Sequence, residues 1–195
     1  MGESSPVKEK QLYHHNSGLV TNGSEDEFKR YIRDIHDFPK KGITFRDITN
    51  LLKNGDVFQK AVDKIAYRFS REKIDVICSV EARGFILGAA LSHAIGTGFV
   101  PIRKKGKLPW KCHQQSYELE YGQDELEIHT DAVSSGSHVL FVDDVLATGG
   151  TAKAAVDLIK KMKGKLVCAT FLIELQELRG RTKLEEVPVY SLMRY

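Results

Sequence analysis

Five continuous apolar runs restrict the fold more than any other feature of this chain. They are the segments 74–80, 98–103, 138–144, 165–174 and 187–193. Segments with helical character, among them 84–95 and 151–163, separate several of these runs. Strands that are apolar throughout are typical of a parallel sheet whose two faces are both covered by helices. We therefore predict an α/β fold with a central parallel sheet of about five strands, flanked by helices.

The segment 104–137 interrupts this pattern. It contains two polar, alternating stretches, "QSYELEY" and "DELEIHT", which meet near Gly122. Alternation on both sides of a glycine is typical of a β-hairpin. We expect a hairpin that projects from the sheet, with residues 104–122 as a flexible arm.

Helix boundaries can be read at three places. Ser24 and Glu27 form an S-x-x-E capping box, which predicts a helix start. The apolar residues that follow at helical spacing predict a short amphipathic helix, and they are Phe28, Ile32 and Ile35. A loop is expected over 36–49 and a second helix from about Asp56. Gly164 is expected to end the helix 151–163 in left-handed geometry.

Length and composition exclude several classes of protein. A chain of 195 residues has the length of one domain, and we predict a mobile tail over 1–23 and a single domain over 24–195. The net charge of +3 is too small for a typical nucleic-acid-binding protein. Three cysteines without paired spacing suit a reducing compartment. With no apolar signal or membrane span, we expect a soluble, cytoplasmic protein that binds neither nucleic acid nor membrane.

The stretch "HVLFVDDVLATGGTAKAAV" (138–156) carries the clearest chemistry. An apolar strand ends in Asp143 and Asp144, and a small-residue turn then opens a helix. The amides and hydroxyls of such a turn bind a phosphate group. The residues expected to do so are Ala147, Thr148, Gly149, Gly150 and Thr151. The two carboxylates would repel phosphate but accept hydrogen bonds from vicinal hydroxyls, so the pair of features suits a ribose 5-phosphate. A strand–turn–helix junction with solvated aspartates is the alternative.

Several motifs together resemble one enzyme family. "VLFVDDVLATGGTA" resembles the phosphoribosyl pyrophosphate motif of the type I phosphoribosyltransferases. From Phe38 to Tyr195 the chain is similar to the adenine phosphoribosyltransferases. It shares with them, in the same order and spacing, "GITFRDIT", "EARGF", "RKKGKLP", "YELEYGQDELEIH" and "VDDVLATGGT".

The resemblance implies a fold, a reaction and partners. The fold would be the Rossmann-like type I phosphoribosyltransferase fold, with a small N-terminal hood at about 24–50. The reaction would convert adenine and phosphoribosyl pyrophosphate to AMP and pyrophosphate, a step of purine salvage, in a homodimer. Mg²⁺ would be required, held mainly through ligand oxygens and water near Asp143 and Asp144, with no direct protein ligand assigned.

For pyrophosphate, the resemblance implicates a helix start and a basic segment. Arg83 and Gly84 would bind it at a helix N-terminus. Arg103, Lys104 and Lys107 of "RKKGKLPWK" would close over it, with Lys111 a weaker candidate. Trp110 departs from the small residue of many relatives. A surface salt bridge for Arg83, and a solvated charge run or nucleic-acid patch for 103–111, are the alternatives.

For adenine, the matching positions lie in "GITFRDI" and after the two aspartates. They are Thr44, through its backbone carbonyl, Arg46, and the pair Phe45 and Val145 that would sandwich the base. Phe45 could instead be a core anchor.

Ala147 stands where hypoxanthine–guanine enzymes have an acid, so another group must handle the purine proton. The resemblance implicates Glu120, with Tyr121 closing the site; the alternative for Glu120 is an exposed strand residue. Ala147 and "GITFRDI" disfavour another base such as hypoxanthine, xanthine or orotate. The short tail and the retained arm disfavour a DNA-binding regulator of the same fold.

Overall fold

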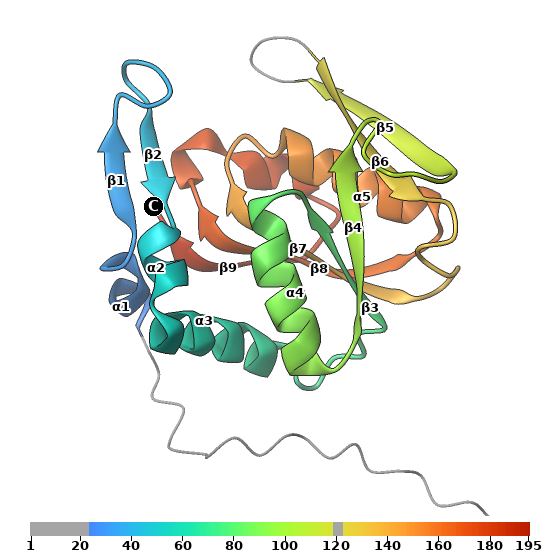
Figure 1. The fold of residues 1–195 in the computed structure, drawn as a ribbon, viewed down its shortest axis with the longest axis horizontal. Coiled ribbons are helices and arrows are strands. Elements are labelled where there is room, and N and C mark those ends of the chain that lie inside the picture. Colours follow the sequence, from blue (N-terminus) through green and yellow to red (C-terminus); the bar gives the residue numbers. More distant parts are fainter. Residues whose placement is uncertain (1–23, 119–122) are drawn as a thin grey trace, which may run out of the picture.

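A seven-stranded sheet forms the centre of the computed structural model, which describes residues 24–118 and 123–195 (Figure 1). The strand order is β5-β6-β4-β3-β7-β8-β9. The strands are β3 Val76–Val80, β4 Gly98–Lys104, β5 Cys112–Glu118, β6 Gln123–His129, β7 His138–Leu146, β8 Lys165–Glu174 and β9 Val189–Arg194. Strands β4, β3, β7, β8 and β9 run parallel, which confirms the predicted parallel sheet.

The hairpin β5–β6 is an extension of this sheet. β6 pairs antiparallel with the end of β4, where Arg103 lies opposite Glu127. β5 pairs with β6 along its whole length. The predicted hairpin is confirmed, and it continues the sheet beyond β4. Glu120, Tyr121 and the turn near Gly122 lie outside the described residues, as does the predicted tail 1–23.

Helices cover both faces of the sheet (Figure 1). They are α1 Glu25–Lys29, α2 Thr49–Lys53, α3 Gly55–Arg68, α4 Arg83–Ile95 and α5 Gly150–Lys161, with the 3₁₀ helices η1 Gln176–Leu178 and η2 Gly180–Leu184. Alternate residues of β7 divide between two cores. Leu140 and Val142 pack with α3 and α4, whereas Val139 and Phe141 pack with α5. Both faces of β7 are therefore buried, which explains its continuous apolar sequence.

The hood differs from the expected helix and loop. α1 ends at Lys29, and Ile35 belongs to strand β1 Arg33–His36, which pairs with β2 Thr44–Asp47. The predicted helix through Ile35 is therefore wrong, and the predicted loop 36–49 is confirmed only for 37–43, between the two strands. The pairing of Ile35 with Phe45 provides hydrogen-bond partners for the backbone groups of both segments. A helix that continued through Ile35 would leave the backbone groups of β2 without these partners. Helix α1 does begin after Ser24, but the Ser24 side chain makes no capping hydrogen bond.

The end of α5 also differs from the prediction. Lys163, not Gly164, adopts the left-handed conformation, with φ +60°. Gly164 serves another purpose, because a Cβ there would lie 3.0 Å from Ile159 Cγ2 and 3.1 Å from Val139 Cγ2. The glycine thus allows the chain to pass close to the core as it enters β8.

The cysteines behave as small apolar residues. Cys78 and Cys168 are buried, and burial raises the pKa of the Cys78 thiol to about 12. Cys112 is only half-buried, on the hairpin. Within residues 24–118 and 123–195, no helix combines the length and apolar character needed to cross a membrane.

Candidate active site

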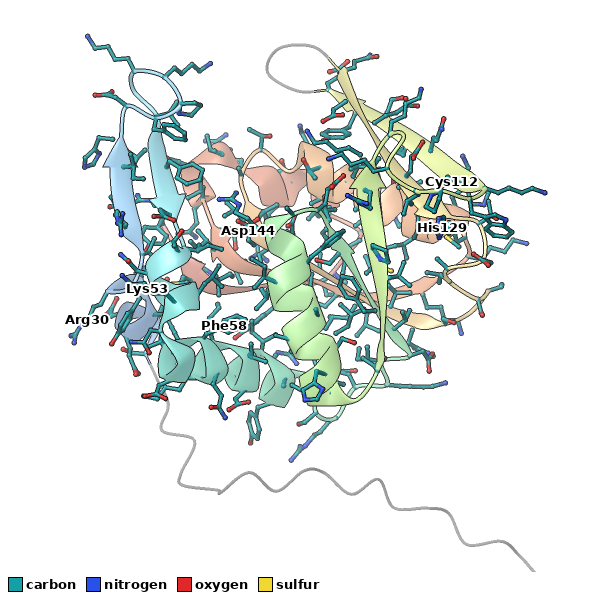
Figure 2. All side chains as sticks on the ribbon, in the orientation of Figure 1. Arg30, Lys53, Phe58, Cys112, His129 and Asp144 are labelled. Carbon is teal, nitrogen blue, oxygen red and sulfur yellow. The ribbon has the colours of Figure 1, made fainter. Side chains whose placement is uncertain are left out.

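The two junctions singled out in the sequence lie side by side. β3 and β7 are neighbouring parallel strands, with Ser79 paired to Val142, so their carboxyl ends open at one edge of the sheet. The segment 81–84 follows β3, and the pair Asp143 and Asp144 lies near the end of β7. Figure 2 shows Asp144 beside the start of α4.

Gly84 permits this close approach. A Cβ at Gly84 would lie 2.5 Å from Asp143 Oδ1 and 2.8 Å from Ser79 Oγ. Ser79 Oγ in turn donates a hydrogen bond of 2.6 Å to the Val142 carbonyl, which fixes it against β7. The first turn of α4 is therefore packed directly on the Asp143 carboxylate, and no larger residue fits at position 84.

Asp143 and Asp144 are buried, at 8% and 5% exposure, so they are not the solvated aspartates of the alternative interpretation. The amide of Asp144 donates a 2.9 Å hydrogen bond to Asp143 Oδ1. Burial, and then the charge of Asp144, raise the pKa of Asp143 well above its ordinary value. Burial also raises the pKa of Asp144, although Arg83 opposes this effect. The site thus holds two carboxylates with little compensation for their charge.

Arg83 connects three of the predicted pieces. Its Nε lies 2.8 Å from Asp144 Oδ2, and its guanidinium lies 5.1 Å from the centre of the Phe45 ring. The side chain therefore reaches from the start of α4 to both β7 and the hood. The salt-bridge alternative for Arg83 describes this contact, but its partner is a buried site carboxylate.

The predicted adenine residues lie on β2 and β7. Phe45 is partly exposed, contacts Phe38 edge-on at 5.3 Å, and belongs to neither core cluster, which argues against a core anchor. Arg46 forms an ion pair with Asp34, and its Cζ lies 4.2 Å from the Tyr195 ring centre. Thr44 Oγ1 lies 3.3 Å from His36 Nδ1. Val145 is half-buried on β7 and packs against the α3–α4 core.

The predicted phosphate loop follows β7 and opens α5. Gly149 has φ +80°, a conformation that favours glycine, and Thr148 is exposed. On β5, the Glu118 carbonyl oxygen lies 3.2 Å, and the Tyr117 ring 3.6 Å, from the position of a Cβ on Gly150. The hairpin therefore lies against the beginning of α5, so the loop sits between the sheet edge and the arm.

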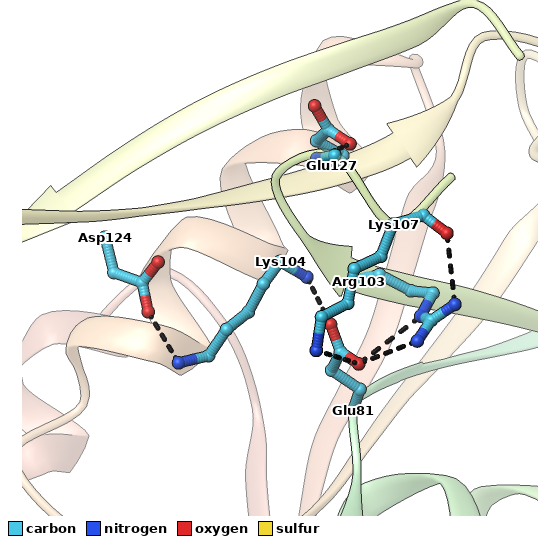
Figure 3. Close-up of polar contacts among 7 residues, drawn as sticks. Glu81, Arg103, Lys104, Lys107, Asp124 and Glu127 are labelled. Carbon is cyan, nitrogen blue, oxygen red and sulfur yellow. Dashed lines mark hydrogen bonds and ion pairs between the residues drawn. The ribbon is translucent and has the colours of Figure 1, made fainter. Parts of the chain in front are cut away.

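The basic segment 103–111, here called the basic arm, is bound to Glu81 (Figure 3). Glu81 Oε2 accepts from Arg103 Nη2 at 3.0 Å and from Lys107 Nζ at 3.3 Å, and Oε1 accepts from the Lys104 amide at 2.6 Å. Burial would raise the pKa of Glu81, but these donors hold it below its ordinary value. The Lys104 side chain instead pairs with Asp124. The fourth candidate, Lys111, precedes β5, and its carbonyl accepts from the Thr130 amide.

Comparisons with known proteins identify the family. Residues 47–191 match the model of the phosphoribosyl transferase domain. The chain is 53% identical over 169 residues to adenine phosphoribosyltransferase from Brachyspira hyodysenteriae, covering 87% of this chain and 99% of that one. The chain belongs to the adenine phosphoribosyltransferase family.

Solved structures agree with this membership. An adenine phosphoribosyltransferase from Thermoanaerobacter pseudethanolicus superposes with a TM-score of 0.86 at 47% identity, over 88% of this chain and all of that one. The enzyme from Saccharomyces cerevisiae does so with a TM-score of 0.83 at 42% identity, over 87% and 98%. The predicted family, the type I phosphoribosyltransferase fold, the enzyme class and the adenine phosphoribosyltransferase activity are confirmed.

Sequence reasoning missed three residues that contact the predicted site residues. Glu81 was quoted only as part of "EARGF", yet it gathers the donors of the basic arm. Arg46 lies over the Tyr195 ring, and the Tyr117 ring lies next to Gly150 of the predicted phosphate loop. Each contact joins segments far apart in the sequence. The one local signal for Glu81 was its position: a carboxylate at the end of a predicted strand, two residues before Arg83.

Proposed function

We propose that the residues at the carboxyl ends of β3 and β7 carry out the transfer of a phosphoribosyl group to adenine. The observation that carries this proposal is the buried pair Asp143 and Asp144, placed between Arg83 and the loop that opens α5. This arrangement suits a ligand with a phosphate at one end, a diol in the middle and a second anionic group at the other end. Phosphoribosyl pyrophosphate has this order of groups.

The ribose would bind at the two aspartates and its 5′-phosphate at the loop 147–151. Asp143 and Asp144 would accept hydrogen bonds from the ribose hydroxyls. As pyrophosphate leaves, positive charge builds on the sugar, and two buried aspartates in their ionised form would stabilise it. Electrostatic preorganisation of this kind contributes roughly several kcal/mol to catalysis.

The leaving pyrophosphate would bind at the start of α4 and along the basic arm. Its proposed ligands are the guanidinium of Arg83, the amide end of α4 at Gly84, and the side chains of Arg103, Lys104 and Lys107. Arg83 is paired with Asp144, and both Arg103 and Lys107 are paired with Glu81. Substrate binding would therefore exchange internal ion pairs for pairs with the ligand.

Adenine would lie between Phe45 and Val145. Thr44 would accept from the exocyclic amine through its carbonyl, and Arg46 would bind the ring edge. The related yeast enzyme was solved with adenine bound, which supports a base site in this fold. Glu120 would handle the purine proton, because Ala147 cannot, and Tyr121 would close the site.

Mg²⁺ fits the donors at this site, with the substrate completing its coordination. The structure shows no group of three or more metal-binding side chains within residues 24–118 and 123–195. Asp144 Oδ2 is a buried oxygen whose close partner is the Arg83 guanidinium at 2.8 Å, and carboxylates with substrate oxygens are usual Mg²⁺ partners. Asp143 and Asp144 would hold the ion directly or through water. Bound there, it would neutralise the charge of the pyrophosphate.

We also propose a homodimer, in which the arm of one subunit serves the site of its neighbour, and a cytoplasmic location.

The assay that tests this function follows AMP formation from adenine and phosphoribosyl pyrophosphate, with hypoxanthine and guanine as control bases. We expect AMP with adenine and little product with either control. Equal turnover of hypoxanthine would contradict the assignment of the base site.

The role of Glu120 is tested by Glu120→Gln. A positioned acid–base group contributes about 10²–10⁴-fold, so kcat should fall in that range while the KM for phosphoribosyl pyrophosphate changes little. Restoration of part of the activity by Ala147→Asp in this background would support proton transfer. A Glu120→Gln enzyme with the parental kcat at every pH would assign Glu120 no part in the reaction.

A further inference from the structure

We infer that Gly180 is a positioning residue for the phosphate loop, and that the ion pair of Glu174 with Arg181 holds it in place. The inference rests on the proposed role of residues 147–151 in binding the 5′-phosphate. Gly180 lies in η2, about thirty residues beyond the loop in sequence, and no motif of the sequence analysis includes it. Its effect would be exerted through the backbone of the loop, without contact with the substrate.

The backbones of the loop and of η2 touch directly. A Cβ on Gly180 would meet the Ala147 carbonyl oxygen at well under 3.0 Å and lie 2.8 Å from the Gly149 nitrogen. In the opposite direction, a Cβ on Gly149 would lie 3.0 Å from the Cα of Gly180. Both neighbours are backbone atoms, so a side chain at either position must displace the main chain. Gly180 therefore supports the loop by direct backbone contact with Ala147 and Gly149.

An ion pair with a buried carboxylate fixes η2 in this position. Arg181 donates to Glu174 through Nε at 2.9 Å and through Nη2 at 2.6 Å, and its Nη1 donates to the Val189 carbonyl at 3.0 Å. Ser191 Oγ donates to Glu174 Oε2 at 2.7 Å. Glu174 is only 5% exposed, whereas the Arg181 side chain is 43% exposed, so the carboxylate is shielded from water and the guanidinium lies partly at the surface. The bidentate geometry fixes the direction of the Arg181 side chain. Arg181, next to Gly180, is thus fastened to both β8 and β9.

The same pair is linked to the strand that enters the loop. Glu174 is the last residue of β8 and lies in register with Leu146, the last residue of β7. The Leu175 amide donates a 2.9 Å hydrogen bond to the Leu146 carbonyl. The start of the loop, at Leu146, and the residue that supports it, Gly180, are therefore both held at the end of β8. A displacement of η2 changes the direction of the loop amides without moving Asp143 or Asp144.

A purely structural role makes a different prediction from a positioning role. If the Glu174–Arg181 pair only stabilises the fold, weakening it lowers the unfolding temperature and leaves the kinetic constants of the folded enzyme unchanged. If it positions the loop, the constants that depend on the 5′-phosphate change selectively. These are the KM for phosphoribosyl pyrophosphate and the Kd for AMP, whereas the Kd for free adenine does not depend on that phosphate.

The first experiment is Gly180→Ala with Gly55→Ala as the matched control. Gly55 opens α3 and has no atom within 4 Å of an added Cβ, so its variant should behave like the parent. Misplacement of a binding group by about 1 Å can cost on the order of 10²-fold, so Gly180→Ala should raise the KM for phosphoribosyl pyrophosphate and the Kd for AMP by about 10- to 100-fold. The Kd for adenine should change by less than about threefold on the same scale.

The second experiment keeps the inference testable if Gly180→Ala does not fold. Arg181→Gln removes the bidentate pair, whereas Arg181→Lys keeps the charge. We expect the same selective rise in both phosphate-dependent constants for Arg181→Gln, and a smaller rise for Arg181→Lys. Unchanged constants in a folded Arg181→Gln enzyme would overturn the inference, as would equal weakening of AMP and adenine binding.

A direct loop variant separates this inference from the proposed site. Thr151→Ala removes a hydroxyl from the loop itself and should raise the Kd for AMP. If Thr151→Ala weakens AMP binding and neither Gly180→Ala nor Arg181→Gln does so, the loop assignment stands and the role of Gly180 is wrong. If Thr151→Ala leaves AMP binding unchanged, the proposed phosphate loop itself is contradicted.

Discussion

At the scale of single residues, burial of Asp143 and Asp144 imposes a cost in stability, which their proposed role in catalysis would explain. Each carboxylate is shielded from water, and Arg83 compensates only one of them directly. Burial and mutual repulsion raise the pKa of Asp143, so its ionised form is less stable in the folded chain than in the unfolded chain. Active sites commonly have such locally unfavourable arrangements, because function is favoured there over stability.

Asp143→Asn should therefore separate stability from activity. Because the folded pKa of Asp143 is raised, the penalty is present above that pKa and absent below the ordinary carboxyl pKa of about 3.9. The variant should unfold at a higher temperature than the parent near neutral pH, with the difference vanishing as the pH falls toward 4. Its turnover should fall by orders of magnitude.

Thermal unfolding across pH and AMP formation check this prediction. Asp157→Asn is the control, because Asp157 lies on α5 and pairs with Lys153 near the surface, so it should alter both properties little. A lower unfolding temperature for Asp143→Asn at neutral pH would show that the carboxylate is stabilising and that the pKa argument is wrong.

At the scale of elements, success and failure of sequence reasoning have a common physical origin. β7 was predictable because both of its faces are buried, which makes Val139 to Val142 apolar without interruption. The strands of the hood were not predictable, because the spacing of Ile32 and Ile35 suits a helix. The pairing of β1 with β2 joins residues that are 8 to 14 positions apart. The contacts of Glu81 and Gly180 depend on segments brought together only by the sheet, and no local pattern encodes them.

The end of α5 offers a test of local geometry. Lys163 has φ +60° and an exposed side chain, and a residue with a Cβ in this conformation costs roughly 1–2 kcal/mol. Lys163→Gly should therefore raise the free energy of unfolding by up to about 1 kcal/mol, after the entropy of glycine in the unfolded chain is subtracted. Denaturant unfolding measures the change. Lys161→Gly, inside the last turn of α5, should have the opposite sign, by about 1 kcal/mol. Destabilisation by both variants would contradict the interpretation of the Lys163 conformation.

At the scale of the whole molecule, the hood is joined to the far edge of the sheet. Glu25 of α1 accepts from the Arg194 amide at the end of β9, and Phe28 is almost fully buried in the α3–α4 core. The first and last elements of the described chain therefore stabilise each other. Arg46 and Lys29 both lie over the Tyr195 ring, which extends this contact toward the proposed base site.

Two truncations test this organisation. Removal of residues 1–23 should leave the unfolding temperature and turnover close to those of the full chain, since their sequence is polar and offers no apolar face with which to dock on the domain. Removal of residues 1–29 also deletes α1 and Phe28, and loss of a buried phenylalanine side chain costs about 3–5 kcal/mol. Calorimetry and AMP formation report both effects. A large loss with the shorter truncation would reveal contacts of the tail that the prediction omits.

The pairing of the proposed pyrophosphate ligands with Glu81 and Asp144 has a consequence for the approach of substrate from solution. A bare cluster of arginine and lysine would attract anions over a long range, and dissolved salt would screen that attraction over about 8–10 Å. Here the positive charges are largely offset by carboxylates of the same chain before any ligand arrives. Capture then depends on short-range exchange of partners, so the rate of association should be nearly independent of ionic strength, and other cellular polyanions gain little from the basic arm.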